Sequence, residues 1–321
     1  MTDYAIDVRG VSKRYDAHVA VKELTLQVPR GTVYGLLGPN GAGKTTTIRM
    51  LLDIIRPDTG TISLLGRPHG DRGALERIGY LPEERGLYKK MTVRDVLRFL
   101  GALKGLAGDD ADRRIDAWME RLALRTAQKD WSTAKVDELS RGMQQKVQFI
   151  ATLLHDPELV ILDEPFSGLD PINAQAMKDT VVALREAGRT VIFSTHIMDN
   201  AERLCDAVCI VSRGEKVLDG RVADVKAAAG TRGVSIVFDA PPAGAVAAVL
   251  RDPALVVHGD DQGRRWEVET AVGADPNALL RALVDAGAAI EQFSRVQPSL
   301  HRIFLERVGA TGVEAGMTGH G

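Results

Sequence analysis

The chain has little of what marks several other classes of protein. It contains only two cysteines, Cys205 and Cys209, and their spacing fits neither a CxxC redox pair nor half of a zinc site. We therefore expect both to be small, buried packing residues. No run of residues approaches the 18 consecutive apolar residues of a membrane-spanning helix. The N-terminus lacks a basic segment followed by an apolar one, so we expect no secretion signal and a cytoplasmic protein.

An excess of charge of one sign is also missing. Lys and Arg number 41 against 43 Asp and Glu, which gives a formal net charge of −2. This balance provides no general attraction to nucleic acid or to an anionic lipid surface, and we expect no nucleic-acid partner. Apolar residues make up 45% of the chain, which is typical of a globular protein with a buried core. The length of 321 residues allows one large domain and a smaller one.

The order of predicted elements indicates where these two domains lie. In residues 1–228, short apolar strands alternate with amphipathic helices, which predicts an α/β domain with parallel core strands covered on both faces. Residues from about 84 to 138 interrupt this alternation with a helical insertion. Residues 229–309 follow the order strand, helix, strand, strand, helix, strand, which predicts a ferredoxin-like α+β domain closed by a last helix. Residues 310–321 are small and Gly-rich, so we expect a disordered tail.

The segment "GPNGAGKTT" carries the strongest chemical signal. It matches G-x-x-x-x-G-K-T, follows a predicted strand and opens a predicted helix. Its glycines let backbone N–H groups converge on phosphate oxygens, and the helix N-terminus adds its positive dipole end. Lys44 can reach the β- and γ-phosphates, and the Thr45 hydroxyl can bind Mg²⁺. The predicted nucleoside triphosphate site consists of Gly38, Pro39, Asn40, Gly41, Ala42, Gly43, Lys44, Thr45 and Thr46.

Two further strands end in groups that suit phosphate chemistry. "LVILDEP" ends in Asp163 and Glu164, which belong at the carboxyl edge of the sheet, beside the phosphate loop. We predict that Asp163 binds Mg²⁺ and that Glu164 is the base that activates the attacking water; a solvated acidic strand end is the alternative. "TVIFSTH" places His196 after another buried strand, where we predict a contact with the γ-phosphate.

The segment "LSRGMQQK" opens a helix in an unusual way. Ser140 is a plausible helix cap, because its hydroxyl can accept a hydrogen bond from a free N–H of the first turn. Gly142 lies inside that first turn, where glycine costs about 1 kcal/mol relative to alanine. We therefore expect another group to approach the backbone at this position.

The phosphate loop, "LSRGMQQK", "LDEP", "SGLD" and His196 occur in an order and spacing that resemble ATP-binding cassette (ABC) ATPases. The resemblance covers roughly residues 3 to 220 and implies a P-loop core with a mixed sheet. It also implies a head-to-tail dimer with two ATPs between the subunits. Ser140 and Gly142 would then contact the γ-phosphate held by the second copy, and Asp170 would pass signals across the dimer.

Other residues depart from, or add to, the common pattern of that family. Tyr15 would stack on the adenine ring, with an exposed turn tyrosine as the alternative. Arg141 replaces one glycine of the signature segment, and Glu83 stands where most members carry a Gln that touches Mg²⁺. Glu83 can still bind Mg²⁺ or its water. Both forms resemble the branch that serves two-component exporters and carries a C-terminal accessory domain. In that domain the last helix would pack Ile303, Phe304 and Val308 inward.

This resemblance implies the ATP-hydrolysing subunit of an ABC-2-type export system. The expected cofactors are ATP and Mg²⁺, and the expected partners are a second copy and a separate membrane permease, on the cytoplasmic face of the membrane. The alternative is a soluble ABC ATPase of translation or DNA maintenance. Such proteins usually carry two cassettes with a charged linker, or long coiled coils, and neither occurs here. A catalytically silent regulator would lack Glu164.

Overall fold

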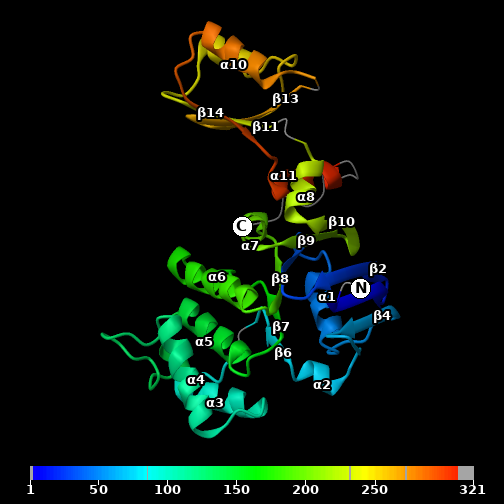
Figure 1. Ribbon diagram of the computed structural model, residues 1–321, viewed down its shortest axis with the longest axis vertical. Coiled ribbons are helices and arrows are strands. Elements are labelled where there is room, and N and C mark those ends of the chain that lie inside the picture. Colours follow the sequence, from blue (N-terminus) through cyan, green and yellow to red (C-terminus); the bar gives the residue numbers. More distant parts are fainter. Residues whose placement is uncertain (1–2, 85, 231–232, 272, 310–321) are drawn as a thin grey trace. The chain divides into compact units, whose positions relative to one another are not determined.

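The structure is a computed structural model that describes residues 3–84, 86–230, 233–271 and 273–309 (Figure 1). The chain forms two compact units: the first ends at Val222 and the second begins at Ala223. The sequence placed this boundary after Ala228, at the end of helix α8 (Val222–Ala228). The predicted tail, residues 310–321, lies outside the described residues.

A six-stranded sheet forms the centre of the first unit, with the strand order β10-β9-β3-β8-β7-β6. All neighbours pair in parallel except β10, which forms an antiparallel edge with β9. The predicted mixed sheet is therefore confirmed. Every residue of β3, β7 and β8 is buried, as expected for parallel strands covered on both faces. The strands are β3 (Val33–Leu37), β6 (Ile78–Leu81), β7 (Leu159–Asp163), β8 (Thr190–Thr195), β9 (Ala207–Ser212) and β10 (Glu215–Arg221).

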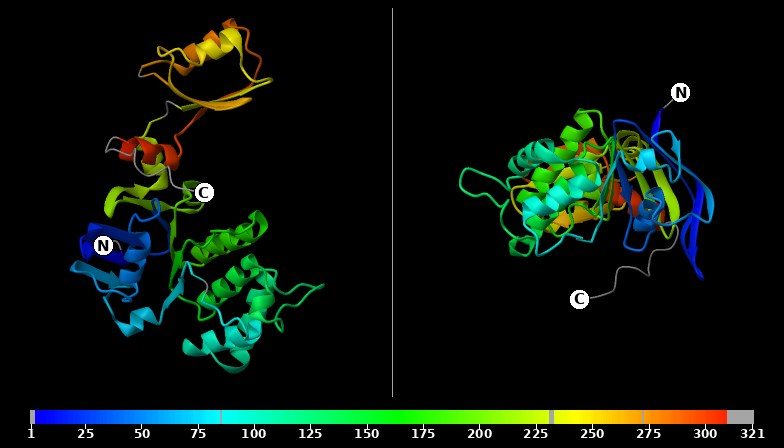
Figure 2. Two further views of the ribbon diagram at one scale, coloured as in Figure 1. Left: turned by 180° about the vertical axis from the view of Figure 1, so that it is seen from behind. Right: turned by 90° about the horizontal axis from the view of Figure 1, so that it is seen from below.

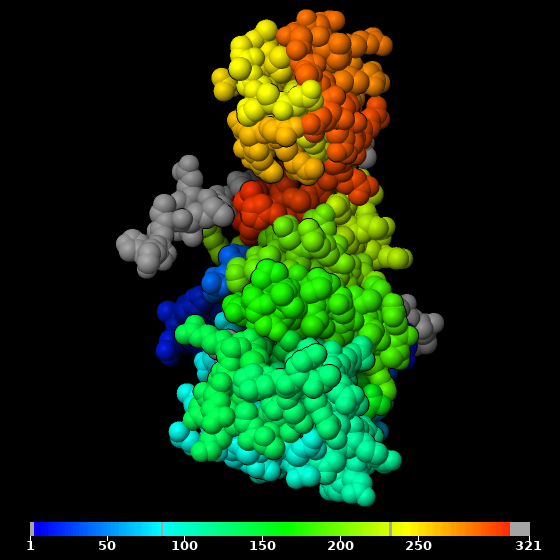
Figure 3. All heavy atoms as spheres, turned by 90° about the vertical axis from the view of Figure 1, so that its left-hand side faces the viewer, coloured from blue at the N-terminus to red at the C-terminus, as the bar shows by residue number. Residues whose placement is uncertain are grey.

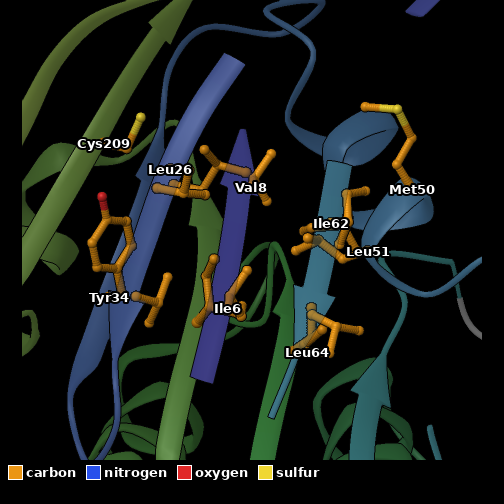
Figure 4. Packing of buried hydrophobic residues seen from close by; sticks show 14 of the residues in the cluster. Ile6, Val8, Leu26, Tyr34, Met50, Leu51, Ile62, Leu64 and Cys209 are labelled. Atoms are coloured by element: carbon orange, nitrogen blue, oxygen red, sulfur yellow. The ribbon is translucent and has the colours of Figure 1, made fainter. Parts of the chain in front are cut away.

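A second, antiparallel sheet covers one face of the first unit in the order β2-β1-β4-β5. Its strands are β1 (Tyr4–Tyr15), β2 (His18–Pro29), β4 (Thr59–Leu64) and β5 (Arg67–Pro68). Helix α1 (Lys44–Leu51) lies on the same face of the central sheet (Figures 1 and 2). Between them lies the main apolar core, in which Ile6, Val8 and Leu26 of this sheet join Met50 and Leu51 of α1 (Figure 4).

Helix α1 is shorter than the sequence suggested. The apolar pattern predicted a helix through Ile55, but α1 ends at Leu51. Asp53 adopts a left-handed conformation with φ 55°, and the N–H groups of Ile54 and Ile55 turn back to the carbonyl of Arg49. That part of the prediction was wrong because the two isoleucines belong to the turn after the helix.

Helices cover the opposite face of the central sheet, and Figure 3 shows this side from outside. The helical insertion packs against α5 there, and Thr92 caps α3 by accepting a hydrogen bond from the Asp95 N–H. No helix among the described residues is long and apolar enough to cross a membrane. The helical elements are α2 (Arg72–Leu75), α3 (Val93–Leu103), α4 (Gly108–Arg121), η1 (Val136–Glu138), α5 (Arg141–Leu153), α6 (Pro171–Glu186) and α7 (Met198–Leu204).

The second unit has the predicted ferredoxin-like order. Its sheet is fully antiparallel, in the order β12-β13-β11-β14, so the first and second strands of the unit flank the third. Ile303, Phe304 and Val308 are buried, as predicted for the last helix. In the first unit, Cys205 and Cys209 are buried and free, as the sequence also predicted. The remaining elements are β11 (Gly233–Phe238), α9 (Gly244–Val249), β12 (Val256–Gln262), β13 (Arg265–Thr270), α10 (Pro276–Asp285), β14 (Ile290–Val296) and α11 (Leu300–Gly309).

Candidate functional site

The carboxyl ends of three neighbouring strands define the candidate site. β3, β8 and β7 lie side by side and run in the same direction. The phosphate loop follows β3, Asp163 ends β7 and Glu164 comes directly after it, and His196 follows β8. Because parallel neighbours end at the same edge of a sheet, groups far apart in the sequence converge here.

The backbone around the phosphate loop explains two of its glycines. A Cβ at Gly38 would lie 2.2 Å from the carbonyl oxygen of Val211, and one at Gly43 would lie 2.4 Å from that of Ala20. Gly43 also has φ 101° and is the N-cap of α1. Since glycine has no side chain to satisfy the first-turn N–H groups of α1, these remain available to an anion.

A cavity of about 350 Å³ opens in front of this loop. It brings together Tyr15 from the end of β1, Glu83 from the segment after β6, and Glu164. Two lining residues, His18 and Ala20, were not predicted from the sequence. The signal for them was the tight β1–β2 hairpin, which pairs Tyr15 directly with His18. The full lining is Tyr15, His18, Ala20, Asn40, Gly41, Ala42, Gly43, Lys44, Thr45, Thr46, Glu83 and Glu164.

The Lys44 side chain is folded onto its own loop. It is 6% exposed, and its Nζ donates hydrogen bonds to the carbonyl oxygens of Gly38 at 2.7 Å and Pro39 at 3.1 Å. The same Nζ lies 3.5 Å from Oε1 of Glu164. A positive charge therefore already stands between the loop and the carboxylate on β7, where phosphate oxygens could replace these partners.

Asp163 has one engaged and one unengaged carboxylate oxygen. Its Oδ1 accepts hydrogen bonds from the hydroxyls of Ser194 and, at 3.4 Å, of Thr45. Burial raises the pKa of Asp163, and the two hydroxyls oppose that shift. Its buried Oδ2 has no hydrogen-bond partner among the described residues. A buried polar atom without a partner is expected to meet a ligand, an ion or water.

The oxygen atoms around Asp163 fit Mg²⁺. Thr45 and Asp163 offer the hard oxygen ligands that this ion prefers, and Glu83 lines the same cavity. Among residues 3–84, 86–230, 233–271 and 273–309, no three His, Cys, Asp or Glu side chains are grouped to hold a metal by themselves. An ion at this place would therefore complete its shell with phosphate oxygens and water, as Mg²⁺ commonly does.

Glu164 and His196 form a pair beside the cavity. Nδ1 of His196 lies 3.0 Å from Oε1 of Glu164, so Nδ1 carries the proton and donates it in this contact. Glu164 is 7% exposed, and its backbone has a left-handed φ of 46°. Side chains with strained backbones cluster at functional sites. The pair could orient a water and accept its proton.

Ser140, Gly142 and Asp170 form a second group that does not line the cavity. Ser140 is the predicted cap of α5, and its Oγ accepts from the Met143 N–H at 3.3 Å. A Cβ at Gly142 would lie 2.9 Å from Nδ2 of Asn173 and 3.6 Å from Oδ2 of Asp170. The group that approaches Gly142 in this structure therefore comes from the same chain.

Asp170 has a structural role of its own. It caps α6, accepts from the Asn173 N–H at 3.0 Å, and its pKa is lowered by this backbone bond. Its side chain also accepts from the Asn173 amide. These bonds lie within the first turn of α6. The first residues of α6 and the N-cap of α5, Ser140, are exposed.

Ser194 is a further residue of the site that the sequence analysis missed. It is fully buried; its Oγ donates to Asp163 and accepts from the Glu164 N–H at 2.9 Å. The sequence feature that could have identified Ser194 is its hydroxyl inside the apolar strand "TVIFST". A buried hydroxyl needs hydrogen-bond partners, so it points to polar groups nearby.

Comparisons with known proteins agree with this geometry. The family "ABC transporter" matches residues 21–167, and "ATP-binding protein DrrA1-3-like, C-terminal domain" matches residues 220–308. A solved structure described as the ATP binding subunit of an ABC transporter is 31% identical, with a TM-score of 0.64. The match covers 70% of this chain and 92% of that one.

Two bacterial relatives extend the match over the chain. The uncharacterized ABC transporter ATP-binding protein YhaQ of Bacillus subtilis is 40% identical over 95% of this chain and 99% of its own. The Nod factor export ATP-binding protein I of Burkholderia lata is 40% identical over 67% of this chain and 70% of its own. These relatives give no support to a soluble ATPase of translation or DNA maintenance. The chain belongs to the ATP-binding proteins of ABC transporters, and it is an ATP hydrolase.

Proposed function

We propose that the chain is the ATP-hydrolysing subunit of an ABC-2-type exporter and works with a separate permease on the cytoplasmic face of the membrane. One observation carries the catalytic part: Asp163, Glu164 and His196 meet the phosphate loop at one sheet edge. The Nod factor export relative and the DrrA1-3-like C-terminal domain support the exporter branch.

In this proposal the cavity holds ATP, with the adenine ring stacked on Tyr15. The loop from Gly38 to Thr46 and the first turn of α1 bind the phosphates. Thr45, Asp163 and Glu83 would hold Mg²⁺, and the bound ion would supply positive charge next to the phosphate oxygens. Lys44 exchanges its hydrogen bonds to the loop carbonyls for bonds to phosphate. This exchange also moves the positive charge of Lys44 away from the Glu164 carboxylate.

Glu164 is the proposed base. Its carboxylate accepts the proton of the water that attacks the γ-phosphate, while the leaving group is ADP. His196 donates from Nδ1 to Glu164 and thereby fixes the carboxylate. The other ring nitrogen, Nε2, is then the atom available to the γ-phosphate.

The group outside the cavity supports a head-to-tail dimer. Ser140 and Asp170 are exposed, and none of Ser140, Gly142 and Asp170 faces the chain's own phosphate loop cavity. We propose that Ser140 and Gly142 contact the γ-phosphate bound by a second copy, and that Asp170 connects the two sites.

The test is the solution mass of Glu164→Gln by light scattering, with and without Mg²⁺-ATP. This variant keeps the binding site but cannot accept the proton, so a monomer should become an ATP-bound dimer. Hydrolysis should fall by at least about 100-fold. Hydrolysis at the wild-type rate would remove Glu164 from the role of base, and a constant monomer would contradict ATP-driven closure by the isolated protein.

An apolar groove in the first unit is the proposed permease contact. It lies between the helical insertion and the core and is lined by Ile54, Tyr80 and Leu103, among others. Leu103 is 69% exposed and Ile54 57%, which is unusual for large apolar side chains. Two residues that line the groove, Gln148 and His155, each have a buried acceptor without a partner among the described residues: Oε1 and Nδ1, respectively. The inserted permease element would therefore combine apolar side chains with hydrogen-bond donors.

A charge in the groove tests this contact. In cells that contain the assembled transporter, Leu103→Asp should move the protein from the membrane fraction to the soluble one. ATP hydrolysis by the purified variant should stay within about twofold of wild type, because the site is separate. Val284→Asp, at a 56% exposed position of the second unit, is the matched control. Wild-type membrane association of Leu103→Asp would exclude the groove.

A further inference from the structure

The buried hydroxyl of Ser194 forms hydrogen bonds with Asp163, at the end of β7, and with Glu164, the next residue. We propose that Ser194 is a positioning residue for ATP hydrolysis, which holds the Asp163 carboxylate and the Glu164 backbone with one oxygen atom. The inference rests on the proposed roles of Asp163 and Glu164 and adds a residue to that machinery. Ser194 makes no contact with the cavity, so it acts only through these two neighbours.

The geometry of Ser194 leaves little freedom. Ser194 lies directly opposite Asp163 in the parallel β7–β8 register and is 0% exposed. A hydroxyl has one proton to donate, and here it goes to Oδ1 of Asp163. Its lone pairs accept the Glu164 N–H at 2.9 Å. Both functions of the hydroxyl are thus used, one on each residue.

The bond to Asp163 sets which carboxylate oxygen is free. Ser194 and Thr45 both engage Oδ1, so Oδ2 is the oxygen left for an ion. Without Ser194, the 3.4 Å contact with Thr45 would be the one hydrogen bond from the described residues that orients the carboxylate. The group could then rotate and offer a different oxygen, which weakens a metal site that needs defined ligand directions.

The bond to Glu164 acts on a strained backbone. L-residues rarely adopt the left-handed φ of 46° found at Glu164. Surrounding contacts must impose such a conformation, and the Ser194 oxygen supplies one of them. Loss of the hydroxyl would let the backbone relax and would move the carboxylate away from its contact with His196.

The strand offers a matched control at its other end. Thr190 is also on β8 and is 2% exposed, and its hydroxyl also accepts a backbone N–H, that of Gly31 at 3.0 Å. It contacts none of the proposed catalytic residues. Thr190→Val therefore removes a buried hydroxyl with a similar bond, while Ser194→Ala removes the one at the site.

The experiment measures steady-state hydrolysis and the binding of a fluorescent ATP analogue, in EDTA and in Mg²⁺. Ser194→Ala should lower kcat by about 10- to 100-fold and shrink the gain in affinity that Mg²⁺ brings. Its affinity in EDTA should stay within about twofold of wild type, since the phosphate loop is intact. Thr190→Val should change none of these quantities by more than about twofold.

Two further comparisons test the proposed role of Ser194. Ser194→Cys keeps most of the volume but hydrogen-bonds weakly, so it should resemble Ser194→Ala; wild-type kcat in this variant would overturn the proposal. Equal losses in Ser194→Ala and Thr190→Val would show a structural role only and would also overturn it. If wild-type protein hydrolyses no ATP, the proposed function fails, while the Mg²⁺-dependent affinity still decides the role of Ser194.

Discussion

Two helices of the first unit begin at glycine-containing segments, and they begin differently. At α1, Gly38 and Gly43 are enclosed by backbone carbonyls, and the N-cap Gly43 has no side chain to bond the first turn. At α5, Ser140 caps the helix, and the atoms nearest to a Cβ at Gly142 belong to the side chains of Asn173 and Asp170. Backbone atoms cannot move without the sheet, whereas side-chain ends can rotate. The phosphate loop is therefore a preformed site, and the start of α5 is an adjustable surface.

The largest expected effect breaks the preformed site. Gly43→Ala would place a Cβ 2.4 Å from the Ala20 carbonyl at a φ of 101°. The loop has to shift, and we expect ATP affinity to fall by at least about 100-fold in calorimetric titration. Gly41→Ala is the control, because its Cβ would meet no heavy atom of the described residues within 4 Å. Similar losses in both variants would mean that backbone conformation alone matters.

The second prediction separates the two helix starts by function. Ser140→Arg, in the Glu164→Gln background, should abolish the ATP-dependent dimer because it places a large charged side chain on the exposed start of α5. ATP should still bind each monomer with unchanged affinity. Light scattering and nucleotide titration check the two parts. Loss of binding by the monomer would show that Ser140 belongs to the site of its own chain.

Ser140→Ala provides the milder companion to that variant. It removes the cap bond to Met143, which is worth about 1 kcal/mol of stability, without filling space. A dimer that survives Ser140→Ala but not Ser140→Arg would point to steric exclusion. A dimer lost in both would assign the contact to the hydroxyl itself.

The smallest expected effect concerns Gly142. Gly142→Ala brings a Cβ to 2.9 Å from the Asn173 amide, which can rotate away. Alanine has a better helix propensity than glycine by about 1 kcal/mol, which should nearly offset the cost of this close contact. The free energy of unfolding measured in urea should therefore change by less than about 1 kcal/mol. In Asn173→Ala protein the same substitution should stabilise by about 1 kcal/mol. A loss above about 2 kcal/mol would mean that the surface at α5 is as rigid as the phosphate loop.

The sequence predicted those parts of the site that are local along the chain. A motif of nine residues identified the phosphate loop, and apolar strands with polar ends located Asp163, Glu164 and His196. Strand neighbours are set by the fold, so the pairing of Ser194 with Asp163 could not be read from spacing. A buried hydroxyl needs partners, but the sequence does not say which ones.

The fold was predictable to a similar degree. The order of strands and helices predicted the parallel core strands and the ferredoxin-like second unit, because few topologies fit each order. The mixed sheet followed from the family resemblance. The order of elements did not show that β4 pairs with β1 in a sheet separate from the central one, since these two strands are distant in sequence. The approach of Asn173 to Gly142 depends on how α5 and α6 pack, which local patterns do not encode.

The left-handed backbone of Glu164 also bears on how the protein tolerates mutation. A non-glycine residue in this conformation costs about 1–3 kcal/mol of a stability that is usually only 5–15 kcal/mol. If Glu164 is the base, as proposed above, glycine at this position would give a more stable chain without activity, and selection for hydrolysis would keep the fold below its attainable stability. The rest of the first unit must therefore supply the stability that is lost at Glu164. The core between β1 and α1 then tolerates fewer destabilising substitutions than the same core would in a protein that binds ATP without hydrolysing it.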